Sequence, residues 1–168
     1  NVRVLDPACG SGNFLYVALQ AIKDLEHRVI VWAQDELSLG LFPRVGPEVV
    51  RGIEISDYAA ELARVTIWIG EIQWMLSHGY AYRRDPVLQP LDNIECRDAL
   101  LDLSNPALPA EAQWPAAEFI VGNPPFIGAS TMRRALGEGY VDAVRSTWPE
   151  VPESADFVMH WWHIAAET

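Results

Sequence analysis

Short apolar segments, each followed by an acidic or glycine-containing turn, alternate with helical patterns along this chain. Segments of this kind are typical of buried parallel strands joined by helical crossovers. We therefore predict an α/β fold in which an open, mostly parallel sheet is flanked by helices on both faces. The predicted strands span residues 4–5, 49–55, 94–96 and 118–121, the predicted helices 13–31, 57–76 and 155–167, and the predicted loops 35–47, 79–90 and 105–115.

The composition is that of one globular domain. The chain has 168 residues, of which 50% are hydrophobic and 21% charged, so a disordered tail or a coiled coil is excluded. It contains no apolar run near the roughly 20 residues that a membrane-spanning helix needs, and we expect a soluble, cytoplasmic protein. Two cysteines, Cys9 and Cys96, are too few for a disulfide framework or a zinc cluster.

The net charge of −11 argues against a protein that holds phosphates over its whole surface, because such affinity comes from Lys and Arg. A catalytic module that relies on another part for its grip on nucleic acid remains possible. The first strand pattern starts with the chain, and the last helical pattern has no terminating Gly or Pro. We therefore expect a fragment of a larger protein.

A glycine-containing turn follows the first predicted strand, in the sequence Asp6-Pro7-Ala8-Cys9-Gly10-Ser11-Gly12-Asn13-Phe14. Its two glycines let the backbone approach a ligand closely just before a helix begins. The turn lacks the third glycine of the dinucleotide-binding fingerprint, and an acid at the strand end repels pyrophosphate. Asp6 favours a cationic group or hydroxyls instead, although the turn taken alone is equally compatible with a purely structural role.

Acidic residues also end the second and third predicted strands. Glu54 stands where an acid commonly binds both hydroxyls of a ribose, and capping or surface exposure is its alternative role. Asp98 could accept a hydrogen bond from an adenine amino group, or could simply cap the turn that it forms with Ala99 and Leu100. Because ligands of open parallel sheets bind beyond the carboxyl ends of the strands, three polar strand ends together indicate a binding site.

The fourth predicted strand is followed by Asn123-Pro124-Pro125-Phe126. Two consecutive prolines fix φ and remove two N–H donors, so this loop is stiff. It can hold the Asn123 side chain and the Pro124 carbonyl as a pair of acceptors for a planar amino group, with Phe126 stacked on the ring that carries it. The alternative is a loop terminator followed by a core phenylalanine.

These motifs resemble those of a known family. The turn from Asp6 to Phe14 resembles motif I of class I S-adenosylmethionine-dependent DNA adenine methyltransferases, and residues 122–126 resemble their motif IV. Segments 52–64 and 125–137, together with the motif V-like pair Asp156-Phe157, resemble the methyltransferase part of MmeI-like Type IIL/IIG restriction-modification enzymes. The resemblance implies a Rossmann-like methyltransferase fold, with residues 1–168 forming a partial catalytic domain that holds the N-terminal half of the sheet.

The resemblance also implies roles for single residues. S-adenosylmethionine would be the cofactor, and the exocyclic amino group of adenine in DNA would be the methyl acceptor. The cofactor site would comprise the first turn (Asp6, Pro7, Ala8, Gly10, Gly12, Asn13 and Phe14) around the methionine part, Glu54 on the ribose, Ile55 on the adenine ring, and Asp98 and Ala99 at the adenine amino group. The catalytic loop would comprise Asn123, Pro124, Pro125 and Phe126, acting on a base flipped out of the duplex.

The family's sheet has seven strands in the order three, two, one, four, five, seven, six, and this chain supplies the first four. The fourth would then be an open edge, so we predict self-association through it and weak cofactor binding by residues 1–168 alone. DNA recognition is expected from parts outside these residues, in the cytoplasm of a prokaryote. No metal site is expected, since His160 and His163 lack matching ligands, and packing or surface roles are favoured for them. No nuclease centre is expected around the lone lysine, Lys23. The tryptophans of the helical segments are expected in the core between helix and sheet, namely Trp68, Trp74, Trp161 and Trp162.

Other functions remain open. Protein-glutamine methyltransferases hold a side-chain amide with a similar Asn-Pro-Pro-aromatic loop, but usually carry Asp-x-Gly-Thr-Gly in the first turn. Cytosine amino methylation and RNA guanine methylation share the reaction class. Cytosine ring-carbon methylation is disfavoured, because the chain has no Pro-Cys dipeptide to supply a nucleophile. A non-catalytic module that only binds the cofactor is a different class of protein.

Overall fold

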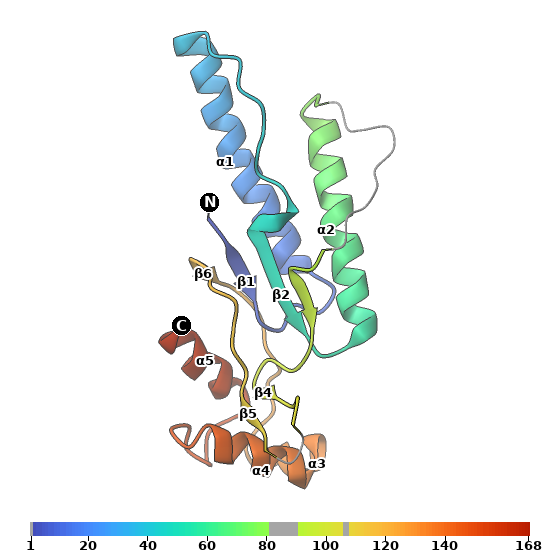
Figure 1. The fold of residues 1–168 in the computed structure, drawn as a ribbon, viewed down its shortest axis with the longest axis vertical. Helices are drawn as coiled ribbons and strands as arrows, with labels where there is room; N and C mark the ends of the chain where they lie inside the picture. Colours follow the sequence, from blue (N-terminus) through green and yellow to red (C-terminus); the bar gives the residue numbers. More distant parts are fainter. Residues whose placement is uncertain (1, 81–90, 106–107) are drawn as a thin grey trace.

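The computed structural model describes residues 2–80, 91–105 and 108–168, and it has the predicted α/β architecture (Figure 1). Four parallel strands lie in the order β3-β2-β1-β6, which is the order that the resemblance implied. The four strands are β1 (Val4–Asp6), β2 (Val50–Glu54), β3 (Ile94–Cys96) and β6 (Phe119–Ile120). Most of the predicted loop at 79–90 lies outside the described residues.

The register of the sheet brings the strand ends together. Asp6 at the end of β1 pairs with Gly52 of β2, and Glu54 at the end of β2 pairs with Cys96 at the end of β3. Two long helices follow β1 and β2, namely α1 (Asn13–Leu37) and α2 (Asp57–Ser77). A short 3-10 helix (Pro47–Val49) leads into β2. The Ser56 side chain caps α2 by accepting a hydrogen bond from the Ala59 N–H.

Each face of the sheet has its own core, because successive strand residues point to opposite sides. On one face Val50 and Ile94 pack with Leu15 and Leu19 of α1 and with Ala60, Ala63 and Ile67 of α2. On the other face Leu5 and Ile53 pack with α4 (Glu138–Thr147) and α5 (Val158–Glu167) through Val141, Val144, Trp161 and Ile164. The prediction of helices on both faces is therefore confirmed.

A buried ion pair joins α1 to α2. The Lys23 ammonium is fully buried and lies 2.9 Å from the Glu71 carboxylate. It also donates a hydrogen bond to the Val45 carbonyl (2.8 Å) and lies 4.5 Å from the centre of the Trp74 ring. The only lysine of the chain thus has a structural partner for each of its donors, away from the strand ends.

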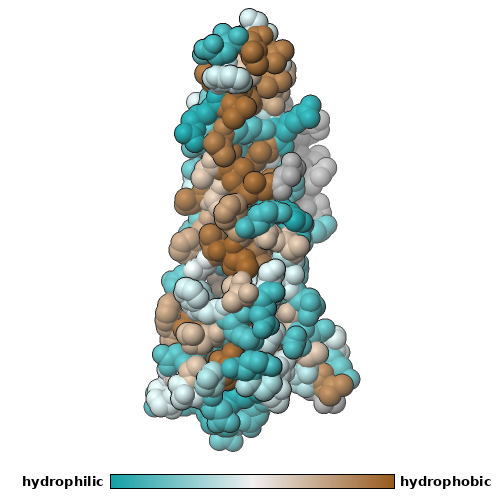
Figure 2. Space-filling view, turned by 90° about the vertical axis from the view of Figure 1, so that its left-hand side faces the viewer, coloured by the Kyte–Doolittle hydropathy of each residue, from teal (hydrophilic) through white to brown (hydrophobic). Residues whose placement is uncertain are grey.

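The far half of α1 leaves apolar side chains uncovered. Leu25, Val29 and Trp32 recur at helical intervals and are all more than half exposed. Figure 2, which views the molecule from the side of α1, shows a band of hydrophobic surface that runs down its upper half. The far half of α1 extends away from the carboxyl ends of the strands (Figure 1). In the part of the chain that the structure describes, none of the helices combines the length and the hydrophobicity that a membrane-spanning helix needs.

Several local predictions were wrong. Helix α1 continues past residue 31 to Leu37, where Ser38 in the left-handed conformation donates its N–H to the Ala33 and Gln34 carbonyls. The predicted loop at 105–115 contains a strand, since β5 (Ala110–Glu111) pairs in antiparallel fashion with β4 (Leu101–Asp102). Trp162 was expected in the core with Trp68, Trp74 and Trp161, but it is 68% exposed.

Candidate functional site

A cavity of about 600 Å³ lies at the carboxyl ends of β1, β2 and β3. It brings together residues from all four predicted strand ends, although these are up to about 120 positions apart in the sequence. The predicted site residues that line it are Pro7, Ala8, Glu54, Ile55, Asp98, Ala99, Asn123 and Pro125. The expected clustering of polar strand ends is therefore present in the fold.

The other predicted residues do not line this cavity. Asp6, Gly10, Gly12, Asn13 and Phe14 belong to the turn behind it, and Pro124 lines a neighbouring hollow of about 740 Å³ along β6 and α5. Phe126 projects from its loop and is 74% exposed. An exposed ring beside a stiff proline pair is available to stack on a partner, and it is not the core phenylalanine of the alternative interpretation.

Asp6 is the most buried of the predicted acids, at 1% exposure. Its Oδ1 accepts a hydrogen bond from the Ala8 N–H (3.0 Å), and its Oδ2 has no hydrogen-bond partner within the described residues. Burial, reinforced by the nearby Glu54 carboxylate, raises the pKa of Asp6 to about 6. A cationic ligand group could supply the hydrogen-bond donor that this buried carboxylate oxygen lacks.

The first turn is folded around Glu54. Gly10 and Gly12 have positive φ, and the backbone N–H of Gly10 donates to Glu54 Oε2 (2.9 Å) while that of Ser56 donates to Oε1 (2.9 Å). Both oxygens of Glu54 are thus held in place, and each keeps a second lone pair for a donor in the cavity. This arrangement fits binding of paired hydroxyls.

Cys9 in the same turn is buried beside β2. Burial, together with the Asp6 and Glu54 charges, raises the pKa of the Cys9 thiol to about 12. The thiol is therefore protonated at neutral pH and is no nucleophile.

Asp98 both caps a turn and faces the cavity. Its Oδ1 accepts from the N–H groups of Leu100 (2.7 Å) and Leu101 (3.2 Å), which is the capping alternative. Its Oδ2 accepts from the Tyr140 hydroxyl (2.8 Å), and the residue lines the cavity. Capping of the turn and binding of a ligand are compatible roles for Asp98, because capping uses Oδ1 and leaves a lone pair on Oδ2.

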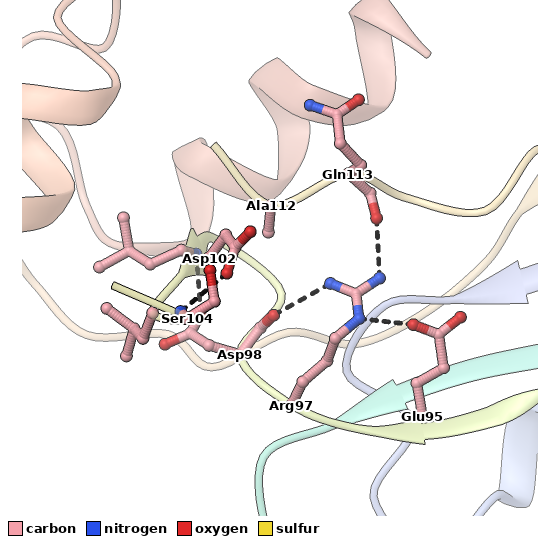
Figure 3. Close-up of a pocket in the computed structure, with 9 residues that line it drawn as sticks. Glu95, Arg97, Asp98, Asp102, Ser104, Ala112 and Gln113 are labelled. Atoms are coloured by element: carbon pink, nitrogen blue, oxygen red, sulfur yellow. Dashed lines mark hydrogen bonds and ion pairs between the residues drawn. The ribbon is translucent and has the colours of Figure 1, made fainter. Parts of the chain in front are cut away.

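Arg97 fixes the backbone of Asp98 (Figure 3). Its guanidinium donates to the Glu95 carboxylate (2.5 Å), to the Asp98 carbonyl (3.2 Å) and to the Gln113 carbonyl (2.7 Å), which ties β3 to the segment after β5. Three of the five N–H donors of Arg97 are thus used within the protein. Glu95, Arg97, Asp98 and Gln113 also border a second hollow of about 560 Å³.

The loop from Asn123 is tied to the start of α5. The Phe157 N–H donates to the Ile127 carbonyl (2.9 Å), and Asp156 Oδ1 accepts from the Ala129 N–H (3.0 Å). The side chains of Asn123 and Pro125 lie at the cavity, on the same side as the Asp98 turn. Residues predicted to bind the cofactor and residues predicted to bind the acceptor thus line the same cavity.

Eight residues that line the cavity were not singled out from the sequence as site residues. Two of them, Ile53 and Arg97, lie at the ends of β2 and β3, and the other six come from the region after the Asn123 loop: Ile127, Ala135, Leu136, Tyr140, Phe157 and Trp161. Trp161 donates to the Pro7 carbonyl (3.3 Å) and packs edge-on against Phe157. The motif V-like pair Asp156-Phe157 was the one available signal for them, whereas Tyr140 had none.

The described residues contain no cluster of three or more His, Cys, Asp or Glu side chains that could hold a metal ion. His160 is buried, and its Nδ1 contacts the Phe157 carbonyl at 3.0 Å. His160 is therefore packed in the interior, which is one of the two roles expected for it.

Comparison with known proteins agrees with the geometry. The family described as "MmeI, DNA-methyltransferase domain" matches the chain over residues 1–168. The chain belongs to this family. The structure of the Type IIL restriction-modification enzyme MmeI in complex with DNA matches with a TM-score of 0.72 at 25% identity, over 99% of this chain and 22% of that one.

Two curated proteins are similar in sequence. DNA methyltransferase A of Bacillus subtilis (strain 168) is 30% identical over 139 residues, which is 79% of this chain and 16% of that protein. A Methanocaldococcus jannaschii protein named as a type II restriction enzyme and methyltransferase is 30% identical over 104 residues, 60% of this chain and 9% of that protein. The MmeI-family domain described here thus spans less than a fifth of the length of these two relatives.

Proposed function

We propose that this MmeI-family domain transfers a methyl group from S-adenosylmethionine to the exocyclic amino group of adenine in DNA, as part of a restriction-modification enzyme. The observation that carries the proposal is the cavity bordered by the ends of three neighbouring strands and by Asn123 and Pro125 of the loop at residues 123–126. The site residues are those named from the resemblance, with Asp6, Glu54 and Asp98 for the cofactor and Asn123 to Phe126 for the base.

The donor set suits S-adenosylmethionine, which would supply an already activated methyl group. The unpartnered Asp6 Oδ2 is matched to an ammonium group, and the two clamped oxygens of Glu54 are matched to ribose hydroxyls. Ile53, Ile55 and Phe157 supply apolar walls for a purine ring, and Asp98 lies at their edge. Each part of the cofactor thus has a chemically suitable partner in the described residues.

The chain's own contribution to the reaction is positioning. Asn123 and the Pro124 carbonyl would accept hydrogen bonds from the target amino group, which fixes its orientation for in-line attack. Phe126 would stack on the extruded base, since the target atom cannot be reached inside a duplex. DNA recognition would come from parts of the longer protein, in agreement with the net charge of −11 on these residues. We place the protein in the prokaryotic cytoplasm.

The test is methyl transfer by the intact natural polypeptide that carries these residues. It is incubated with S-adenosylmethionine labelled in the methyl group and with duplex DNA, and the DNA is digested to nucleosides. We expect label in N6-methyladenine. We expect Asn123→Ala to lose transfer while keeping cofactor affinity, and Ser130→Ala, an exposed neighbour in the same segment, to change neither. Label in cytosine, RNA or a glutamine peptide, with none in adenine, would refute the proposed substrate.

A further inference from the structure

The backbone of the Asp98 turn is fixed from several sides. Two tryptophans hold the carbonyls of Ala99 and Leu100: Trp114 Nε1 donates to the Ala99 carbonyl (2.7 Å), and Trp148 Nε1 donates to the Leu100 carbonyl (3.0 Å). The Asp98 carbonyl accepts from Arg97 (3.2 Å; Figure 3). With its backbone held in this way, the remaining freedom of Asp98 lies in its side chain.

Tyr140 removes that freedom. Its hydroxyl donates to Asp98 Oδ2 at 2.8 Å, while Oδ1 is held by the Leu100 and Leu101 N–H groups. A carboxylate oxygen has two lone pairs, so Oδ2 keeps one for a donor inside the cavity. Burial and the Asp98 charge raise the pKa of Tyr140 above its usual value, so the hydroxyl remains a donor at neutral pH.

Tyr140 is itself rigidly placed. It lies on α4 and packs against the buried cluster that contains Val141, Val144, Leu100 and Leu101. Its ring packs edge-on against Phe157, with centroids 6.3 Å apart. The Phe157 N–H donates a hydrogen bond to the carbonyl of Ile127, which lies in the loop that follows the Asn123 motif. Tyr140 therefore connects the acceptor side of the cavity to the carboxylate on its cofactor side.

We propose that Tyr140 is a positioning residue, which holds the Asp98 carboxylate in the rotamer that selects a 6-amino purine in the cofactor. This inference rests on the proposed function, because it takes the 600 Å³ cavity as the cofactor site. Tyr140 acts through Asp98 and is assigned no contact with the reacting atoms.

The experiment compares two ligands that differ only in the amino group. S-adenosylhomocysteine and its analogue with hydrogen at purine C6 are titrated into the intact natural polypeptide by calorimetry. Because a hydrogen bond to a charged group is at stake, we expect the amino ligand to bind about tenfold more tightly than the analogue. In Tyr140→Phe this preference should fall to about threefold or less, through weaker binding of the amino ligand only.

Three further variants isolate the mechanism. Asp98→Ala should lose the preference, and the double variant Asp98→Ala/Tyr140→Phe should bind both ligands as Asp98→Ala does, since Tyr140 would act only through Asp98. Tyr16→Phe is the matched control, because it removes a hydroxyl that contacts Gln73 between α1 and α2 instead. This control should keep the full preference.

The outcomes separate the two proposals. Equal weakening of both ligands in Tyr140→Phe would show a purely structural role, and tighter binding would show that Tyr140 blocks the site; either result overturns the inference while leaving the cofactor site intact. If the natural protein binds neither ligand, or if Glu54→Ala binds both unchanged, the proposed function itself fails.

Discussion

Asp6 gives the sharpest prediction, because the fold buries this carboxylate without completing its hydrogen bonds. Raising the pKa from 3.8 to about 6 corresponds to about 3 kcal/mol, at about 1.4 kcal/mol per pKa unit. The folded-state pKa is the higher one, so the unfolded chain ionises first as the pH rises. The free energy of unfolding should therefore fall between about pH 4 and pH 6 and remain lower above that range.

The perturbation is Asp6→Asn, which keeps the shape and removes the titration. Packing and hydrogen-bonding changes that do not depend on pH cancel when the variant is compared with the natural chain at two pH values. We expect the stability of the variant, relative to the natural chain, to be about 2–3 kcal/mol greater at pH 8 than at pH 4. Urea unfolding followed by tryptophan fluorescence measures both free energies.

Glu118→Gln is the control of opposite sign. Hydrogen bonds from the Arg3 side chain and N–H lower the pKa of Glu118 to about 2, so its stabilisation is present above about pH 4.5 and is lost as the pH falls towards 2. This variant should lose more stability at pH 8 than at low pH. If the difference in unfolding free energy between Asp6→Asn and the natural chain is the same at pH 4 and pH 8, then ionisation of Asp6 does not destabilise the fold and the argument is refuted. The same concentration of S-adenosylhomocysteine should stabilise Asp6→Asn less than it stabilises the natural protein.

Three further predictions concern other parts of the fold. Lys23→Met should cost about 3–5 kcal/mol in urea unfolding because it leaves the Glu71 charge buried, and adding Glu71→Leu should recover most of that loss; equal loss in both variants would contradict the argument. Gly52→Ala should cost about 1–3 kcal/mol by the same assay, since a Cβ there would lie 2.8 Å from the Cys9 sulfur, and a neutral result would show that the core yields. Sedimentation of residues 1–168 alone should show self-association through the edge of β6, which Ile120→Pro should abolish; a monomer at every concentration would refute it.

The sheet could be predicted because its signals are local. An apolar segment that ends in Asp6, Glu54 or Asn123 identifies both the strand and the point where it ends, and the order β3-β2-β1-β6 followed from the family that those motifs resemble. The same signals identified eight residues that line the cavity. The start of α2 could be predicted as well, because Ser56 is a common N-cap residue.

The features that were missed depend on contacts between distant residues. Nothing near Tyr140 in the sequence indicates that its hydroxyl meets Asp98, 42 positions away. The β4–β5 pair is too short to carry an alternating pattern, with two residues in each strand. Phe119 was expected in a buried strand, but it is 58% exposed because β6 lies at the edge of the described sheet. In each case the position in the fold, which the local sequence does not record, decides the outcome.

The three acids at the strand ends differ in what the fold leaves for a ligand to do. Glu54 and Asp98 are already held by N–H or O–H donors, so their placement is complete and a ligand adds only a hydrogen bond to a lone pair that remains. Asp6 retains a buried oxygen without a donor, and its charge is destabilising until a cation arrives. The largest gain on binding should therefore come from the ammonium end of the cofactor, while Glu54 and Asp98 determine which ribose and which base are accepted. This division predicts that loss of Asp6 weakens all ligands carrying an ammonium group alike, whereas loss of Asp98 changes the choice among purines.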